Sequence, residues 1–113
     1  MNVSIIGSGY VGLVTAACFA DLGHNVTCVD INRKKINSLK KSVIPFYEPG
    51  LKEIVQKNFK SGFLNFTSSY KVGCKNAEVF FICVDTPDDG SGNPNLKNLN
   101  KVIQSLAKNI NTD

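Results

Sequence analysis

Three glycines near the start of the chain have the spacing of a phosphate-binding turn. Gly7, Gly9 and Gly12 follow the apolar run 3–6 and precede a run of helical character, so the predicted order is strand, glycine turn, helix. In such a turn the first glycine permits a sharp bend, the second lets the backbone approach a pyrophosphate, and the third lets the helix pack closely. Backbone N–H groups at the start of the helix would then bind the phosphate charge.

Asp30 ends the next predicted strand, about 20 residues after the glycine turn, which is where a dinucleotide-binding motif needs a carboxylate. This carboxylate is suited to accept hydrogen bonds from adenosine ribose hydroxyls, and it would repel a 2′-phosphate. Asp30 therefore favours NAD over NADP, although the basic run 33–35 could pair with such a phosphate. A tight strand–helix turn that binds no ligand is the alternative interpretation of the glycines.

Alternating strands and helices must position these residues. Four runs rich in β-branched and aromatic residues are predicted as strands: 3–6, 25–31, 64–67 and 78–84. Five segments are predicted as helices: 11–22, 33–41, 51–60, 68–75 and 96–110. The alternation favours an α/β fold of the Rossmann type, a doubly wound parallel sheet with strand order 3-2-1-4, in which the hydrophobic run 78–84 is a buried strand.

The last predicted helix would ordinarily lead to a further strand. We therefore expect residues 1–113 to be an incomplete dinucleotide-binding domain. If a partner domain normally covers it, apolar surface should be exposed on the last helix and beside the run 78–84.

Val84 and Thr86 follow the fourth predicted strand and are further candidates for the site. In a doubly wound sheet, ligands bind beyond the carboxyl ends of the strands at the switch point, here 3–6 and 78–84. Thr86 would offer a hydroxyl to the cofactor there, while Pro87 stops the strand. A simple strand-terminating turn is an equally good interpretation.

Composition and charge argue against several other classes of function. The net charge is +4, but no aromatic residues alternate with the basic clusters, so we expect no nucleic-acid partner. No apolar run approaches the roughly 20 residues that a membrane helix needs, and we expect a cytoplasmic protein. The four cysteines have no metal-ligand spacing and are predicted to be reduced core residues: Cys18, Cys28, Cys74 and Cys83.

The sequence gives His24 no catalytic role and leaves the roles of Glu48 and Tyr10 open. His24 follows a predicted helix end and is expected in a surface turn. Glu48 lies in a loop with two prolines, where it would either fix the loop as a hydrogen-bond acceptor or act in the site. Tyr10, inside the glycine turn, must point either into a substrate cleft or across the start of the helix.

Four stretches together resemble the UDP-glucose/GDP-mannose dehydrogenase family: GSGYVGL at 7–13, VD at 29–30, PFYEPGL at 45–51 and VDTP at 84–87. The resemblance spans nearly the whole chain. It is specific because the loop 45–51 and the Thr-Pro strand end are not general features of dinucleotide-binding folds.

The resemblance implies an NAD-binding domain that precedes a connecting helix and a sugar-nucleotide domain. Such an enzyme oxidises the C6 alcohol of UDP-glucose to the carboxylate of UDP-glucuronate with two NAD, and is usually a homodimer. By resemblance, the pyrophosphate would lie on the glycine turn with Ser8, Tyr10 and Val11, the adenosine ribose on Asp30 and Lys35, and Thr86 near the cofactor. GDP-mannose or a UDP-N-acetylhexosamine remain alternative substrates, and a dinucleotide-binding module without catalysis is the alternative function.

No catalytic residue is expected among these 113 residues. By resemblance, the nucleophilic cysteine of the family lies in a glycine-flanked motif far beyond residue 113. Oxidising an aldehyde by hydride transfer first needs a tetrahedral adduct, which an activated thiolate supplies. The cysteines present here lack that setting, so we expect the isolated chain to bind NAD and to turn over nothing.

Overall fold

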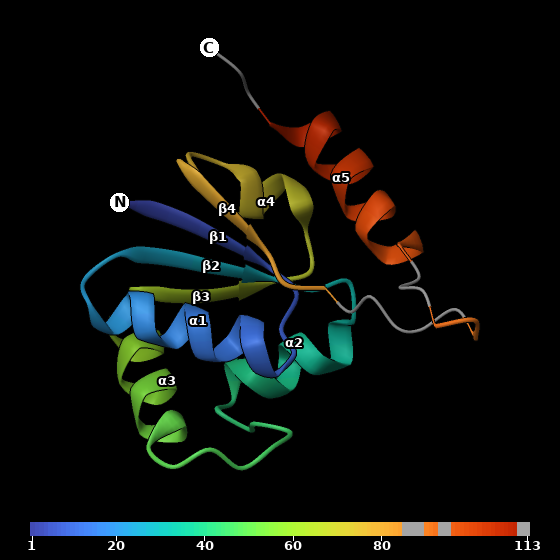
Figure 1. Cartoon of the computed structure of the whole chain (residues 1–113). Helices are drawn as coiled ribbons and strands as arrows, with labels where there is room; N and C mark the ends of the chain where they lie inside the picture. Colours follow the sequence, from blue (N-terminus) through green and yellow to red (C-terminus); the bar gives the residue numbers. More distant parts are fainter. Residues whose placement is uncertain (85–89, 93–95, 111–113) are drawn as a thin grey trace.

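The computed structural model describes residues 1–84, 90–92 and 96–110, and its centre is a parallel sheet. The four strands are β1 (Asn2–Ile6), β2 (Asn25–Val29), β3 (Leu64–Thr67) and β4 (Val79–Ile82). Their order is β3-β2-β1-β4, and each neighbouring pair runs parallel (Figure 1). The predicted strand order 3-2-1-4 and the Rossmann-type fold class are confirmed.

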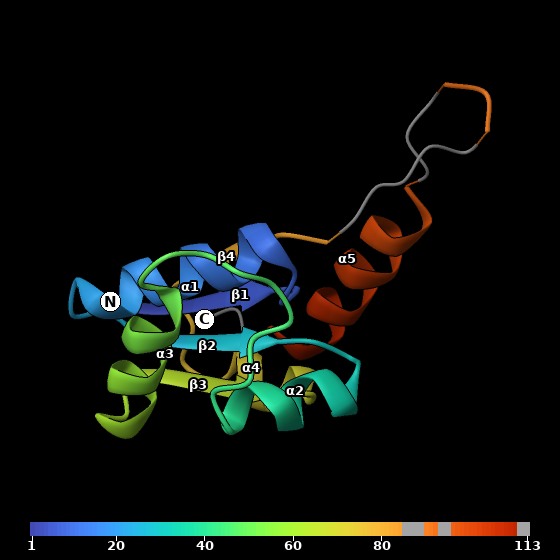
Figure 2. The same cartoon turned by 90° about the horizontal axis from the view of Figure 1, so that it is seen from below.

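Helices cover both faces of the sheet. They are α1 (Tyr10–Asp21), α2 (Arg33–Lys40), α3 (Leu51–Lys60), α4 (Tyr70–Cys74) and α5 (Lys97–Asn109). Figures 1 and 2 show α1, α2 and α3 on one face, with α4 and α5 on the other. The predicted segments agree with these bounds to within two residues at each end.

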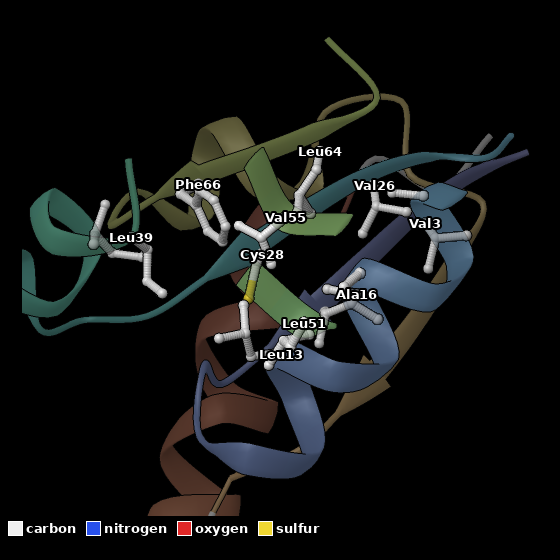
Figure 3. Close-up of a cluster of buried hydrophobic side chains, with 14 residues drawn as sticks. Val3, Leu13, Ala16, Val26, Cys28, Leu39, Leu51, Val55, Leu64 and Phe66 are labelled. Atoms are coloured by element: carbon white, nitrogen blue, oxygen red, sulfur yellow. The ribbon is translucent and has the colours of Figure 1, made fainter. Parts of the chain in front are cut away.

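The larger core lies between the sheet and the helices α1, α2 and α3. Its side chains come from alternate positions of β1, β2 and β3 and from the apolar face of each helix (Figure 3). Small residues let α1 approach the sheet closely, and Ala16 and Ala17 are fully buried beside Leu13. A second cluster, which includes Val29, Val102 and Leu106, joins α5 to the opposite face.

The sequence predicts β4 as a buried strand. This prediction is wrong for the described residues. Phe81 is 37% exposed and Ile82 is 39% exposed. The reason is that β4 lies at the end of the described sheet order, where its partner is β1. The apolar surface expected beside this run is present, and on α5 the side chain of Ile103 is 49% exposed.

The cysteines are free thiols, but they are not all core residues. Cys28 and Cys74 are buried as predicted and Cys83 is half-buried, whereas Cys18 is exposed because it faces outward from α1. His24 lies in the turn between α1 and β2, where its N–H donates to the carbonyl of Phe19 at 3.2 Å, so the predicted turn is confirmed.

Within the described ranges, none of the helices is both long and apolar enough to cross a membrane. Residues 1–84, 90–92 and 96–110 also contain no group of three His, Cys, Asp or Glu side chains that could hold a metal ion.

Gly73 lets α4 lie directly on β2. A Cβ at this position would collide with Cγ2 of Val29, a stiff and fully buried side chain. The crossover from β3 to β4 therefore passes over the sheet at a distance that only glycine allows.

In the variant Gly73→Ala, overpacking is expected to cost about 1–3 kcal/mol. Alanine normally favours a helix over glycine by roughly 1 kcal/mol, which offsets part of this cost, so the free energy of unfolding should fall by up to about 2 kcal/mol. Urea denaturation measures it. In the double variant Val29→Ala/Gly73→Ala the collision is removed, so the combined loss should be smaller than the sum of the single losses; additive losses would contradict the contact.

Candidate functional site

A pocket of about 490 Å³ lies at the carboxyl ends of β1, β2 and β4. Several residues that the sequence singled out line it: Gly7, Ser8, Gly9, Asp30, Lys35 and Val84. This is the predicted position, beyond the strand ends at the switch point of the sheet. The pocket brings together the glycine turn and the acidic residue, although Ser8 and Asp30 are 22 positions apart in sequence.

Gly7 forms the bend between β1 and α1. Its φ of +104° is one that residues with a side chain rarely adopt, and a Cβ there would also meet the backbone carbonyl of Cys83. The N–H of Gly7 donates to the carbonyl of Val29 at 2.7 Å. The bend is therefore held between the ends of β2 and β4.

Gly9 and Gly12 are glycines for different reasons. A Cβ on Gly12 would collide with the carbonyl of Gly7, so α1 rests directly on the turn. A Cβ on Gly9 would meet no protein atom within 4 Å. Packing within the described chain thus explains Gly12 but not Gly9, and the open space over Gly9 is the kind that a close ligand would need.

The start of α1 has the chemistry of an anion site. Gly9 is the N-cap residue, no side chain caps this end, and the first turn contains no acidic residue. The first hydrogen bond of the helix runs from the N–H of Leu13 to the carbonyl of Gly9, at 2.9 Å. The N–H groups that precede it have no acceptor within the helix, and the helix dipole gives them a partial positive charge.

Asp30 accepts hydrogen bonds on both carboxylate oxygens. Ser8 donates twice to Oδ2, from its N–H at 3.1 Å and its hydroxyl at 2.6 Å. The N–H of Asn32 donates to Oδ1 at 3.0 Å, and Nζ of Lys35 lies 3.7 Å from Oδ2. Partial burial alone would raise the pKa of Asp30, but these donors and the lysine charge hold it below its usual value. Asp30 is therefore ionised at neutral pH.

Ser8 is the residue whose geometry was least expected. The resemblance placed it among the pyrophosphate contacts, but its side chain is fully buried and its hydroxyl is directed to Asp30. In this arrangement Ser8 joins the glycine turn to the end of β2. Sequence patterns gave no signal for this link, because it connects residues 22 positions apart.

Tyr10, Val11 and Gly12 are not among the residues that line the pocket. The hydroxyl of Tyr10 donates to Oε2 of Glu48 at 2.7 Å, and this hydrogen bond raises the pKa of Tyr10. Of the two orientations considered for Tyr10, the structure has the one across the helix start. Val11 is 64% exposed.

The strand end after β4 is described only in part. Val84 lines the pocket, whereas Thr86 falls within 85–89, outside the described residues, as does Asp85.

Sequence reasoning missed the opposite wall of the pocket. Tyr70 of α4 contributes to it, and so do Lys101, Ser105 and Lys108 of α5. The last three recur at spacings of four and three, which puts them on one side of a helix. This spacing was a usable signal, but nothing in the sequence said which face of the sheet α5 would approach.

The thiol below the turn is unsuited to nucleophilic chemistry. Cys28 is buried, and burial together with the charge of Asp30 raises its pKa to about 12. Burial also raises the pKa of Cys83, which lines the pocket. A nucleophile must be a thiolate, so neither group has the required ionisation at neutral pH.

Known proteins are similar to this chain in both sequence and fold. A model of the UDP-glucose/GDP-mannose dehydrogenase family, NAD binding domain, matches residues 1–113. UDP-glucose 6-dehydrogenase YwqF of Bacillus subtilis is 42% identical over 113 residues, which are 100% of this chain and 26% of that protein. The UDP-glucose 6-dehydrogenase of Rhizobium meliloti is 45% identical over 111 residues, covering 97% of this chain and 25% of that protein.

A solved ternary complex of GDP-mannose dehydrogenase from Pseudomonas aeruginosa has the same architecture. It superposes with a TM-score of 0.90 at 36% identity, over 94% of this chain and 24% of that one. This chain thus spans about a quarter of the length of its relatives. The family resemblance expected from the four sequence stretches is confirmed, and with it NAD as the cofactor: the chain belongs to the UDP-glucose/GDP-mannose dehydrogenase family and corresponds to its NAD-binding domain.

Proposed function

We propose that this chain is the NAD-binding part of a longer enzyme that oxidises the C6 alcohol of UDP-glucose to the carboxylate of UDP-glucuronate. The observation that carries the proposal is the similarity, over 97–100% of this chain, to proteins named UDP-glucose 6-dehydrogenase, combined with an uncapped helix start beside an ionised carboxylate. Residues 1–113 are proposed as an amino-terminal domain, and a connecting helix and a sugar-nucleotide domain are proposed to follow it.

The pocket fits a dinucleotide in three respects. The space over Gly9 is open to a pyrophosphate, and the N–H groups at the start of α1 suit its charge. Asp30 is ionised and lies in the wall of the same pocket, where it can accept hydrogen bonds from ribose hydroxyls. When bound, NAD supplies the hydride acceptor, while these residues hold and orient it.

Lys35 supports NAD rather than NADP. Its ammonium lies 3.7 Å from Asp30, so its charge is already partly balanced by that carboxylate. A 2′-phosphate would have to compete with Asp30 for this lysine and would be repelled by the same carboxylate. Lys35, which taken alone would favour NADP, is therefore part of an NAD site in this proposal.

The substrate alternatives keep the same cofactor site. The solved GDP-mannose dehydrogenase superposes on this chain with a TM-score of 0.90, so GDP-mannose is the second candidate. A UDP-N-acetylhexosamine is a third. We further propose a homodimer in the cytoplasm for the complete enzyme, with its nucleophilic cysteine outside these 113 residues.

The variant Asp30→Ala is expected to weaken NAD binding by about 1–3 kcal/mol, the scale of a lost charge-assisted hydrogen bond. Isothermal titration with NAD measures the change. Ser8→Ala is the matched control, because it removes the hydroxyl hydrogen bond to Asp30 but keeps the backbone one and the carboxylate itself, and its loss should be smaller. A folded Asp30→Ala variant that binds NAD with wild-type affinity would show that Asp30 does not bind the cofactor.

Gly9→Ala and Gly12→Ala are expected to separate binding from folding. Gly9→Ala should lower the free energy of unfolding by less than about 1 kcal/mol, because its methyl group meets no protein atom and only the N-cap preference for glycine over alanine is lost. The same variant should weaken NAD binding about tenfold, or about 1.4 kcal/mol. Gly12→Ala should instead destabilise the fold, because its methyl group collides with Gly7. Thermal unfolding and NAD titration of both variants measure these effects. Wild-type affinity in Gly9→Ala would argue against a pyrophosphate above this residue.

The intact protein from its native source is expected to have a mass several times 12.3 kDa and to reduce two NAD for each UDP-glucose oxidised. Mass spectrometry and the absorbance of NADH test both points, with GDP-mannose and UDP-N-acetylmannosamine as competing substrates. If either competitor is oxidised faster than UDP-glucose, that competitor is the substrate. If the native mass is 12.3 kDa, the protein is a dinucleotide-binding module without catalysis.

A further inference from the structure

The segment between α2 and α3 is a shaped loop with fixed ends. At its start, Ser42 is buried with a φ of +60°, and its N–H donates to the carbonyl of Leu39 at 2.9 Å. In its middle, Phe46 packs against the larger core. At its end, the N–H of Leu51 donates to the carbonyl of Glu48 at 3.1 Å. The backbone that carries Glu48 is therefore held at both ends and by the core.

Tyr10 connects this loop to the start of α1. Its hydroxyl donates to Oε2 of Glu48 at 2.7 Å, and its ring centre lies 5.1 Å from that of Phe46. The loop passes beside α1 in Figure 2. We call these two contacts, the Tyr10–Glu48 hydrogen bond and the Tyr10–Phe46 ring contact, the clasp.

The rest of this helix start has little side-chain support. Gly9 has no side chain and open space around it, and Val11 is 64% exposed. No side chain caps the helix. Of the residues from Gly9 to Val11, Tyr10 is thus the one whose side chain attaches this stretch to the body of the described protein.

We propose that Tyr10 and Glu48 are positioning residues that hold the first turn of α1 in the orientation needed to bind the pyrophosphate of NAD. This inference rests on the proposed cofactor site. The N–H groups of a helix start must converge on the same phosphate oxygens, and a turn that is already fixed loses less freedom when the ligand binds. Neither Tyr10 nor Glu48 lines the pocket, so the clasp fixes the turn from outside it.

The role of Glu48 in the clasp is to accept a hydrogen bond, not to provide charge. A negative charge near the helix start does not attract a pyrophosphate, so the carboxylate itself contributes nothing favourable to binding. Glutamine keeps an acceptor oxygen at the same reach, whereas alanine removes it. The clasp therefore predicts different results for these two substitutions.

The test compares Tyr10→Phe, Glu48→Ala, Glu48→Gln and the double variant Tyr10→Phe/Glu48→Ala in the protein as its source produces it. Tyr47→Phe is the matched control, since it removes the hydroxyl of an adjacent tyrosine that is 87% exposed. NAD titration is expected to show a roughly three- to tenfold weaker Kd for Tyr10→Phe and for Glu48→Ala, the range of one hydrogen bond. The double variant should be no weaker than either single variant, and Glu48→Gln and Tyr47→Phe should bind as the wild type does.

A second measurement needs no cofactor. Amide hydrogen exchange at Leu13, whose N–H makes the first hydrogen bond of α1, should be faster in Tyr10→Phe and Glu48→Ala and unchanged in Glu48→Gln. Wild-type NAD affinity in a folded Tyr10→Phe protein, or additive losses in the double variant, would overturn the clasp. If the wild-type protein binds no NAD, the proposed function fails instead, and the exchange measurement still decides whether the clasp holds the turn.

Discussion

The contact between Gly12 and the carbonyl of Gly7 determines where α1 begins, and the rest of the site depends on that position. Because neither residue has a side chain, the helix starts directly at the carboxyl edge of the sheet instead of one side chain further away. Its partial positive charge is thereby brought to the ends of β1 and β2, next to Asp30. A side chain at Gly12 would collide with the carbonyl of Gly7, and one at Gly7 would collide with the carbonyl of Cys83, so neither position accepts a bulkier residue without a shift of the backbone.

Two attachments hold the glycine turn from opposite sides. Inside the fold, Ser8 gives both its N–H and its hydroxyl to Asp30, which ties the turn to the end of β2. Outside, Tyr10 reaches Glu48 on the loop after α2. The residues between and after these anchors, Gly9 and Val11, are left open to solvent or ligand. The turn is therefore rigid at its supports and accessible at its centre, which is the arrangement that a backbone anion site requires.

The sequence was sufficient for the features that follow from local rules. Glycine spacing, hydrophobic periodicity and the acidic residue at a strand end predicted the strand order and the place of the pocket, because each depends on a few neighbouring residues. The link from Ser8 to Asp30 and the contact of Gly73 with Val29 depend on the distance between elements that are far apart in the chain. The exposure of Phe81 was missed for the same reason, since the burial of a strand depends on its neighbours and not on its own hydrophobicity.

The two ionisable groups below the turn have opposite net pKa shifts, although burial raises the pKa of both. Asp30 remains charged because Ser8, Asn32 and Lys35 together outweigh the cost of taking its carboxylate out of water. Cys28 has no such donors; its Sγ donates to the carbonyl of Gly7 at 3.7 Å, and burial and the charge of Asp30 raise its pKa to about 12. The carboxylate that suits a ribose therefore suppresses a thiolate beside it. A site built in this way favours holding a dinucleotide and disfavours covalent catalysis by its own cysteine.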